Sequence, residues 1–470
     1  MHFDFLALIN GYRSEDRNTP FYCELGAELK QRGYSFASIT TSRFADNFVA
    51  SYGHTYFNLH DMTQALKSRR EISYPEEAER IEQKYNISIK NYCLAEAMLK
   101  MPHSKNDKQL YEEVIEDFIL VEDFLESHQV GCFIQMQGGE IIRRALSEVG
   151  GHRNIPSVWI NWSPIKGCMT LHSSELDIWD DLKEIKSFKD LTEEEIGKAE
   201  TYITSFRNSR EMYLHPRQLR IWIKPQAISR PFQELYRKYR VNKGQESRKI
   251  LKYYSLSLQM RFKKLLYNIS LSQNLDRGGK FFFFPLHFPQ ESQLTIRAPH
   301  CLKQEAIVDI IARSLPSGYK LYVKEHPNHI GVIPFRVIRQ ISKMKDVVLL
   351  HPQTHSHKLI RKSAGVIVIN STTGFESILY QKPVVVLGKP FYSRLGLTID
   401  VADYFYLPEA LREALRLREI PYGKVVAFIS AVLKVSYKGC YGDSSQQNIK
   451  AVADSILSYL GKVASKGSLL

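Results

Sequence analysis

The sequence predicts an α/β protein with two doubly wound domains that face each other across a cleft, joined by a helical insertion. Its 470 residues exceed the length of one typical domain. Strand-like and helix-like stretches alternate over residues 1–170, the alternation stops over residues 171–275, and it returns over residues 276–440. Such alternation is typical of a parallel sheet covered by helices. We expect residues 441–470 to form a C-terminal helix and tail.

The first domain contains apolar runs of strand length separated by longer periodic stretches. We expect a first strand that ends near Asn10, and further strands at residues 34–40, 131–135 and 156–162. We expect helices at residues 21–32, 76–101, 110–127 and 141–149.

The second domain repeats this pattern. We expect strands at residues 281–284, 319–323, 347–350, 365–369 and 383–388. We expect helices at residues 304–314, 335–344, 356–363 and 375–381, followed by helices between residues 407 and 460. No G-x-G-x-x-G follows the first strand, so a dehydrogenase-type dinucleotide site is not expected.

Composition predicts a water-soluble protein. Hydrophobic residues make up 44% of the chain and charged residues 24%, and no apolar run approaches the roughly 20 residues that span a bilayer. The N-terminus has an acid and no basic region before its apolar stretch, so we expect a strand there, not a signal peptide, and a cytoplasmic protein. The six cysteines form no C-x-x-C pair, which argues against a disulfide framework and a structural zinc site.

The positive charge is concentrated in one segment. Of the net charge of +14, residues 206–264 contribute nearly the whole excess, with Tyr, Trp and Leu interleaved among the basic residues. Such a segment can lie on an anionic bilayer, where each basic residue near the surface is worth about 1 kcal/mol. It could equally bind an acidic polymer, or be a solvated helical insertion. We expect attachment to the inner membrane surface and no binding of nucleic acid.

Two polar motifs follow predicted strands of the second domain. Lys324-Glu325-His326-Pro327 ends one strand, and Asn370-Ser371-Thr372-Thr373-Gly374-Phe375-Glu376 ends another. The carboxyl ends of parallel strands lie at one edge of the sheet, where such folds bind ligands. The second motif also opens a helix, whose free N–H groups and positive dipole end suit a phosphate. We expect Lys324 and His326 to assist from a neighbouring strand.

These motifs resemble the capsule polysaccharide biosynthesis family, whose relatives include bacterial Kdo transferases of capsule assembly. The resemblance runs from about residue 281 to residue 398. It includes Pro285-Leu286-His287 leading to Gln290-Glu291-Ser292, Lys324-Glu325-His326-Pro327, the stretch from Ser356 to Ile360, the Asn370 motif, and Gly388-Lys389-Pro390-Phe391-Tyr392.

The resemblance implies a GT-B-like, metal-independent glycosyltransferase that transfers a sugar from a nucleotide donor, with CMP-Kdo as one candidate, to a glycan or glycolipid acceptor. No cofactor is implied. The residues that match the donor site are His326, Ser371, Thr372 and Glu376, and the chemistry of the motifs adds Lys324 and Thr373 as donor-site candidates. Glu291 matches the catalytic carboxylate, and the chemistry of the residues adds His287 and Glu140 as catalytic candidates.

Each of these residues also has a plainer interpretation. Glu291 could be a nucleophile, a general base or an ordinary loop acid, and His287 a base, a phosphate ligand or a structural histidine. Glu376 could bind ribose hydroxyls, or it could be an ordinary acid near a helix N-terminus, where the helix dipole favours negative charge. Glu140, after Gly138-Gly139, could activate an acceptor hydroxyl or cap a helix. His351, His355 and His357 are spaced like metal ligands, but no carboxylate stands in register, so we expect no metal site.

Other functions remain open on the sequence alone. A polyol-phosphate transferase of the teichoic-acid type shares the fold, but usually has an Asp-Tyr-Ser-Ser turn where this chain has Asn370-Ser371-Thr372-Thr373. A nucleotide-sugar epimerase would not need the basic insertion. A non-catalytic component of capsule synthesis or export, and a nucleic-acid-binding protein, are the alternatives from other classes.

Overall fold

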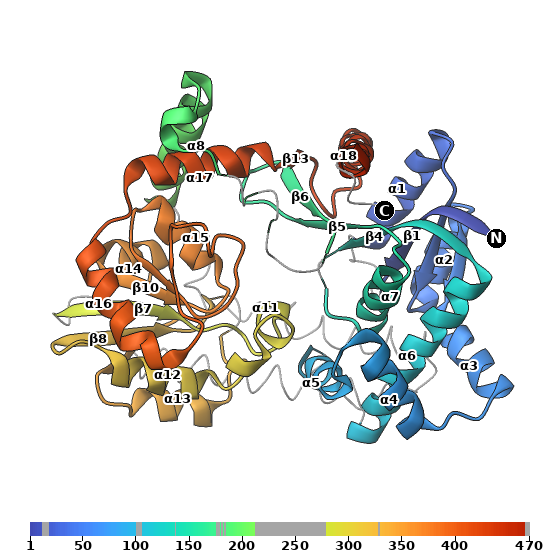
Figure 1. The fold of residues 1–470 in the computed structure, drawn as a ribbon, viewed down its shortest axis with the longest axis horizontal. Helices are drawn as coiled ribbons and strands as arrows, with labels where there is room; N and C mark the ends of the chain where they lie inside the picture. The colour runs from blue at the N-terminus through green and yellow to red at the C-terminus, as the bar shows by residue number, and fades with distance from the viewer. Residues whose placement is uncertain are drawn as a thin grey trace, which may run out of the picture. The chain divides into compact units, whose positions relative to one another are not determined.

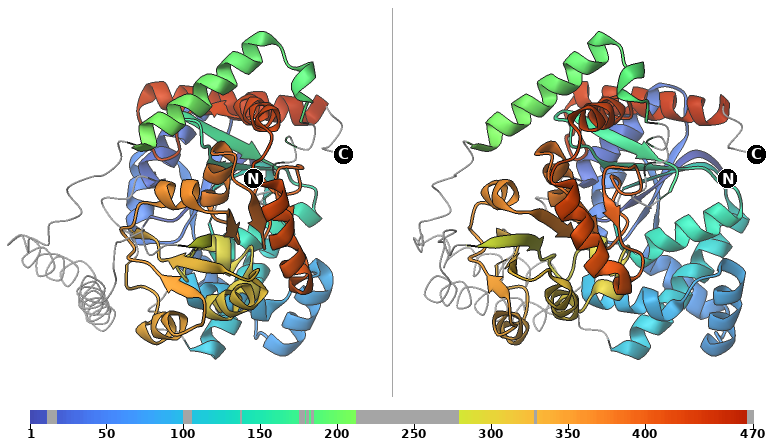
Figure 2. Two further views of the ribbon diagram at one scale, coloured as in Figure 1. Left: turned by 90° about the vertical axis from the view of Figure 1, so that its left-hand side faces the viewer. Right: turned by 60° about the vertical axis from the view of Figure 1, so that its left-hand side comes forward.

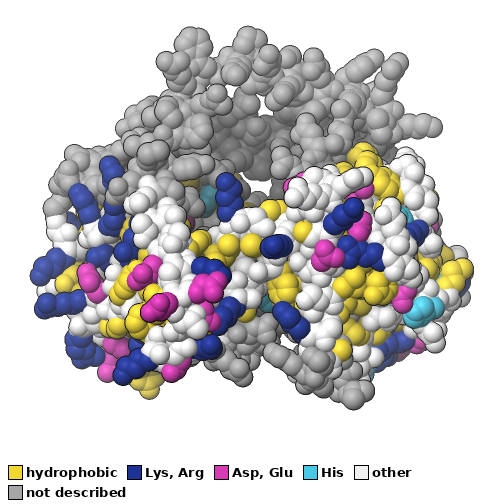
Figure 3. All heavy atoms as spheres, turned by 90° about the horizontal axis from the view of Figure 1, so that it is seen from above, with side chains coloured by type: hydrophobic (Ala, Val, Ile, Leu, Met, Phe, Trp, Pro, Cys, Tyr) yellow, Lys and Arg dark blue, Asp and Glu magenta, His cyan; other side chains and the backbone are white. Residues whose placement is uncertain are grey.

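The computed structural model describes residues 1–11, 18–99, 106–136, 138–174, 179, 182, 185–211, 279–327 and 330–465. The chain divides into two compact units (Figure 1). Unit 1 consists of residues 1–96, 105–182 and 431–470, and unit 2 of residues 97–104 and 183–430. The basic segment predicted from the sequence is described only over residues 206–211. On the described surface that Figure 3 shows, basic and acidic side chains are intermixed.

Unit 1 is built on a seven-stranded sheet in the order β13-β6-β5-β4-β1-β2-β3. The strands are β1 (His2–Ile9), β2 (Phe36–Thr40), β3 (Thr55–Asn58), β4 (Gln129–Met136), β5 (Ser157–Trp162), β6 (Cys168–His172) and β13 (Tyr437–Lys438). The five adjacent strands β3, β2, β1, β4 and β5 are parallel to one another, whereas β6 and β13 are antiparallel to their neighbours.

Helices cover both faces of this sheet. The helices are α1 (Asn18–Gln31), α2 (Arg43–Ser51), α3 (Leu59–Arg69), α4 (Tyr74–Tyr85), α5 (Ile89–Leu99), α6 (Asp107–Ser127), α7 (Ile141–His152) and α18 (Gln446–Ser465). Alternation along β1 sends Phe5, Ala7 and Ile9 into a core with α1, α2 and α18. The same alternation sends Leu6 and Leu8 into a core with α3, α4, α6 and α7.

Unit 2 is built on a six-stranded parallel sheet in the order β12-β11-β10-β7-β8-β9. The strands are β7 (Lys280–Pro285), β8 (Tyr319–Lys324), β9 (Val347–Leu349), β10 (Gly365–Val368), β11 (Val384–Val386) and β12 (Ile399–Asp400). The helices are α8 (Glu193–Glu211), α11 (Ser292–Thr295), α12 (Gln304–Ser314), α13 (Phe335–Ser342), α14 (Ser356–Lys362), α15 (Thr372–Leu379), α16 (Leu407–Leu417) and α17 (Tyr422–Lys434).

Both sheets have the doubly wound strand order of a Rossmann-like domain. In unit 2 the chain runs from β7 outward to β9, then returns to β10 and runs outward to β12. Right-handed crossovers therefore place α12 and α13 on one face and α14 and α15 on the other, as Figures 1 and 2 show. The direction of winding reverses between β7 and β10, and in unit 1 between β1 and β4. The expected fold class of two doubly wound Rossmann-like domains is confirmed.

Several predicted boundaries differ from the observed ones. The helix expected over residues 76–101 is two helices, because Asn86 adopts a left-handed conformation (φ 51°) that ends α4. Elements α2, β3 and α3 were not predicted. Residues 431–440, expected in the second domain, belong to unit 1, since β13 pairs with β6 and α18 packs on α1. None of the helices among the described residues is long and apolar enough to cross a bilayer.

Candidate functional site

A hydrogen bond bridges the winding reversal of unit 2. His287 follows β7 and Asn370 follows β10, and the backbone N–H of Asn370 donates to Nε2 of His287 at 3.3 Å. Because this nitrogen accepts, the ring proton lies on Nδ1, which donates to Oε2 of Glu291 at 2.9 Å. The imidazole is almost wholly buried, whereas the Glu291 side chain is 30% exposed. His287 thus orients a carboxylate that a ligand can reach.

The loop that carries this pair is held from two sides. The Gln304 side chain accepts from the backbone N–H of His287 and donates to its carbonyl, both at 2.8 Å. The Asn370 amide donates to the Gln293 carbonyl and accepts from the Lys389 N–H, both at 2.7 Å. These bonds fix the loops after β7 and β10 against each other at the carboxyl edge of the sheet, where doubly wound folds bind ligands.

The hydroxyl-rich turn opens α15, as predicted. The Ser371 hydroxyl accepts from the Thr373 N–H at 3.2 Å and lies 3.0 Å from the Thr373 hydroxyl, so Ser371 caps the helix. Thr372 is exposed. Gly374 packs directly against the Tyr392 hydroxyl, which itself donates to the Ser371 carbonyl. The turn is therefore a rigid structure that presents Thr372 to solvent.

Lys324 lies inside the protein. Its ammonium donates to the Thr354 carbonyl at 2.9 Å and to the Ser356 hydroxyl at 2.6 Å. Burial lowers its pKa from 10.5 to about 8, although the nearby Glu376 carboxylate favours the charged form. The hydrogen bonds tie the end of β8 to the start of α14, so the Lys324 ammonium is a buried group that joins these two segments.

The expectation that Lys324 and His326 lie on a strand next to β10 is wrong. Strand β7 stands between β8 and β10, because the first strand of a doubly wound sheet lies at its centre. His326 is exposed in the loop after β8. Parallel strands are about 4.8 Å apart, so the loops after β8 and β10 are separated by the loop that carries His287.

Glu376 lies on the second turn of α15, since this helix starts three residues earlier than predicted. Its carboxylate is 3.8 Å from Nε2 of His357 and interacts electrostatically with Lys324. His351 and His355 accept backbone hydrogen bonds through Nδ1, from Gln353 and Lys358. Among the described residues there is no group of three or more His, Cys, Asp or Glu placed to hold a metal ion.

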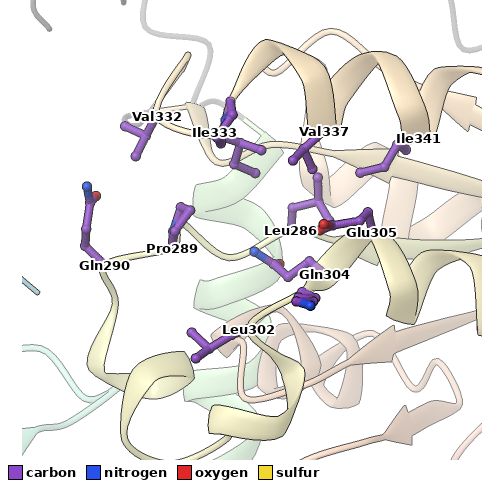
Figure 4. A pocket seen from close by; sticks show the side chains of 12 residues that line it. Leu286, Pro289, Gln290, Leu302, Gln304, Glu305, Val332, Ile333, Val337 and Ile341 are labelled. Carbon is purple, nitrogen blue, oxygen red and sulfur yellow. The ribbon is translucent and has the colours of Figure 1, made fainter. Parts of the chain in front are cut away.

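An apolar pocket of about 240 Å³ lies beside the Glu291 loop (Figure 4). The loop after β7, the start of α12 and one side of α13 form its walls. The lining residues are Leu286, Pro289, Gln290, Leu302, Lys303, Gln304, Glu305, Val332, Ile333, Pro334, Val337 and Ile341. The sequence motifs did not predict this pocket, since its walls come from apolar residues scattered over three segments.

The winding reversal of unit 1 is bridged in a similar way. The Asn10 amide, after β1, donates to Oε1 of Glu140, after β4, at 2.6 Å. Nε of the buried Arg143 donates to Oε2 at 2.8 Å. Burial opposes the charged carboxylate, but Arg143 and Asn10 lower the pKa of Glu140 to about 2. Glu140 occupies the N-cap position of α7, as the plainer interpretation expects, but its side chain makes no capping hydrogen bond and instead pairs with Arg143 and Asn10.

Gly138 makes room for this ion pair. A side chain there would collide with the Glu140 carboxylate and with Nε of Arg143. The Gly138-Gly139-Glu140 motif therefore lets a 29% exposed carboxylate lie against a buried guanidinium at the carboxyl edge of the sheet. Arg143 was not predicted; its position three residues after Glu140 in a helix is the only signal that the sequence contains.

Comparison with known proteins finds similarity to proteins of capsule assembly. Residues 214–415 match the model of the family described as "Capsule polysaccharide biosynthesis protein". The chain is 27% identical over 158 residues to the capsule polysaccharide modification protein LipB of Neisseria meningitidis, covering 32% of this chain and 38% of LipB. It is 25% identical over 149 residues to the capsule polysaccharide export protein KpsS of Escherichia coli, covering 29% and 38%.

The chain thus spans well under half the length of the curated relatives it matches. Among solved structures, it is similar to KpsC of Thermosulfurimonas dismutans, a beta Kdo 2,4 transferase, at 14% identity and a TM-score of 0.38, covering 73% of this chain and 94% of that one. It is also similar to the calicheamicin glycosyltransferase CalG4, at 14% identity and a TM-score of 0.31, covering 99% and 100%. Scores this low carry no argument about activity. The predicted resemblance to the capsule family is confirmed over residues 214–415.

Proposed function

We propose, from the confirmed resemblance to the capsule polysaccharide biosynthesis family, that this protein is a glycosyltransferase that uses a nucleotide-activated sugar to build a bacterial capsule or other surface polysaccharide. One observation supports this most: the Glu291–His287–Asn370 chain of hydrogen bonds spans the winding reversal of unit 2, beside the hydroxyl-rich start of α15. A reactive carboxylate and a phosphate-binding helix start at one sheet edge are the parts that glycosyl transfer requires.

In this proposal the donor binds at the carboxyl edge of the unit 2 sheet. Thr372 and Thr373 offer hydroxyls to the phosphate, and the dipole of α15 favours its negative charge. His326 adds a hydrogen bond or a positive charge from the loop after β8, and Lys324 adds positive charge from the interior. Together these groups stabilise the leaving phosphate as the glycosidic bond to it breaks.

Glu291 then acts at the sugar. Glycosyl transfer passes through an oxocarbenium-like state, which a carboxylate near the anomeric carbon stabilises. His287 donates its Nδ1 proton to this carboxylate and keeps it oriented. Because Nε2 of His287 accepts from Asn370, the imidazole is a positioning group in this state of the protein, not a free base.

Glu140 is proposed to bind an acceptor hydroxyl in unit 1. A carboxylate whose pKa is about 2 stays charged at neutral pH, so it can accept a hydrogen bond from a hydroxyl but is a weak proton acceptor. Its proposed contribution is therefore to orient the hydroxyl of a glycan or glycolipid. The basic segment, residues 206–264, is proposed to hold the protein at an anionic inner-membrane surface, on the support of its sequence charge.

A panel of nucleotides tests the proposal. The thermal unfolding midpoint of the full chain is measured with CMP, CDP, UDP, GDP and their sugar-linked forms, CMP-Kdo included. A ligand at 100 times its Kd stabilises the native state by about 2.7 kcal/mol. We expect one base to give a clear upward shift. No shift with any nucleotide would contradict the proposal and favour a non-catalytic component of capsule synthesis or export.

A variant tests the site. His326→Ala is expected to abolish sugar transfer from the donor that the panel identifies, while the far-UV circular dichroism spectrum stays that of the wild type. Arg313→Ala, which removes an exposed helix pair on α12, is the matched surface control and should keep full transfer. Full transfer by the His326 variant would remove that residue from the donor site.

A further inference from the structure

The last described turn of α8 packs on the helix that presents the hydroxyl-rich turn. Nε of Arg207 donates to the Leu379 carbonyl at 2.7 Å, and its Nη2 is 3.4 Å from Oε1 of Gln381. Leu379 is the last residue of α15, and carbonyls at this end have no partner within the helix. A guanidinium there satisfies the carbonyl and opposes the negative end of the helix dipole.

The end of α15 is held further by the residue that follows it. Gln381 has a left-handed backbone (φ 60°), and its side-chain amide donates to the Ile420 carbonyl at 3.1 Å. The Ile420 N–H donates back to the Gln381 carbonyl at 2.7 Å. The Arg207 guanidinium also lies over the Tyr422 ring, 5.9 Å from its centroid. Arg207 therefore joins α8, the end of α15 and the start of α17.

Phe206 packs against two rings beside α15. Its ring packs edge-to-face against the His357 imidazole, with centroids 5.8 Å apart, and lies 6.0 Å from the Tyr380 ring. The His357 and Tyr380 rings are themselves 5.8 Å apart. His357 is 8% exposed, so these aromatic rings fix its orientation. Nε2 of His357 is then 3.8 Å from the Glu376 carboxylate.

Two adjacent residues of α8 thus contact α15 and a residue that faces it. Arg207 holds the C-terminal end of α15, and Phe206 holds the imidazole that faces Glu376 on the same helix. Glu376 in turn interacts with Lys324 at the end of β8. Figure 2 shows the C-terminal end of α8 beside the helices of unit 2. Both residues precede the stretch that matches the capsule family, residues 214–415.

We propose that Phe206 and Arg207 are positioning residues of the donor site: they hold α15 and His357 in the arrangement that places Glu376 and the Ser371–Thr373 turn for a nucleotide. The proposal rests on the proposed function of this site. A positioning role differs from a purely structural one in its effect on binding. It predicts that these variants lose more nucleotide affinity than a variant that is destabilised equally at another place in the protein.

The test measures nucleotide binding and stability on the same full-length proteins. CMP, CDP, UDP and GDP are titrated into the wild type by calorimetry, and the one that binds is titrated into Phe206→Leu, Arg207→Gln and the milder Arg207→Lys. Ile338→Val, a buried change on α13 on the opposite face of the sheet, is the stability-matched control. All titrations are made well below the lowest unfolding midpoint of the set.

We expect Kd to rise fivefold or more in Phe206→Leu and Arg207→Gln, and less in Arg207→Lys, which keeps the charge but cannot donate to two acceptors with the same geometry. The control should bind within twofold of the wild type. In transfer assays the same variants should raise the KM for the donor more than they lower kcat.

Two results overturn the inference without touching the proposed function. One is wild-type affinity in both Phe206→Leu and Arg207→Gln. The other is an affinity loss in the control as large as in these variants, which would mean that the contacts affect binding only through the stability of the protein. Absence of binding to the wild type by all four nucleotides has a different meaning: it removes the donor site itself, and with it any positioning role.

Discussion

Replacing Lys324 with methionine should change how the stability of the protein depends on pH. Lys324 is 3% exposed, and burial lowers the pKa of its ammonium from 10.5 to about 8. The folded chain therefore releases this proton near pH 8, whereas the unfolded chain keeps it until about pH 10.5. Between these values the unfolded state binds more protons, so the free energy of unfolding rises with pH.

The size of the effect follows from the same pKa values. Each pKa unit corresponds to about 1.4 kcal/mol, so the wild type should gain about 3 kcal/mol from this residue between pH 8 and pH 10.5. Lys324→Met has no charge to desolvate and lacks this gain. It also loses the hydrogen bonds to Thr354 and Ser356, but that cost is nearly independent of pH.

Urea unfolding of wild type and Lys324→Met, followed by circular dichroism at several pH values from 7 to 10.5, measures the difference between them. Across this range the free energy of unfolding of the wild type should rise by about 3 kcal/mol relative to that of the variant. Lys343→Met, a change of an exposed lysine after α13, is the control and should run parallel to the wild type. A difference between wild type and Lys324→Met that stays constant would refute the desolvation of this ammonium.

The remaining predictions concern the hydroxyl-rich turn and unit 1. Gly374→Ala places a methyl group against the Tyr392 hydroxyl and should cost about 1–3 kcal/mol and weaken nucleotide binding. A methyl group at Gly197 on α8 would meet nothing within 4 Å, so Gly197→Ala should stabilise the protein by about 0.5–1 kcal/mol. If urea unfolding showed Gly374→Ala to be more stable than Gly197→Ala, the packing of Gly374 on Tyr392 would be contradicted. Glu140 has a folded pKa of about 2 against 4.5, so the wild type should lose about 3 kcal/mol as pH falls between these values. Glu140→Gln should be less stable at neutral pH, because Arg143 loses its charged partner, and should lack that acid-induced loss; an equal acid loss in the variant would argue against the ion pair.

Much of unit 2 was predictable because its strands are short apolar runs bounded by polar motifs. Strands β7, β8, β9, β10 and β11 and the helices α12 to α15 lie close to the predicted ranges. The order of the strands was not predictable from local pattern. Sequence order suggests that β8 and β10 could be neighbours, but the winding of the sheet puts β7 between them.

The elements that sequence reasoning missed carry weak local signals. Strand β3 is an edge strand whose Thr55 and Tyr56 are exposed, so it lacks an apolar run. The return of α18 to unit 1 is a long-range contact, and its own sequence shows only an amphipathic helix. The split between α4 and α5 depends on the left-handed backbone of Asn86. Asparagine also occurs in right-handed and extended backbone, so its presence alone did not predict the split.

The positions of the proposed site residues were easier to predict than their contacts. The motifs located His287 and Glu140 just after strands, where the structure also places them. Which groups they contact depends on other segments of the chain: the Asn370 backbone N–H donates to His287, and the Asn10 side chain donates to Glu140. Lys324 was expected to assist from its strand end, but its ammonium bonds inside the protein, because a strand-end side chain can point into either layer of the fold.

Hydrogen exchange of the full chain with and without the nucleotide that binds it tests the central claim most directly. If the winding reversal of unit 2 holds the nucleotide, amide protection should rise in peptides that cover residues 285–291 and 370–376. Peptides from α12 and α16 should exchange at the same rate with and without the ligand. Protection confined to unit 1, or spread evenly over unit 2 with no increase at these two loops, would contradict the account.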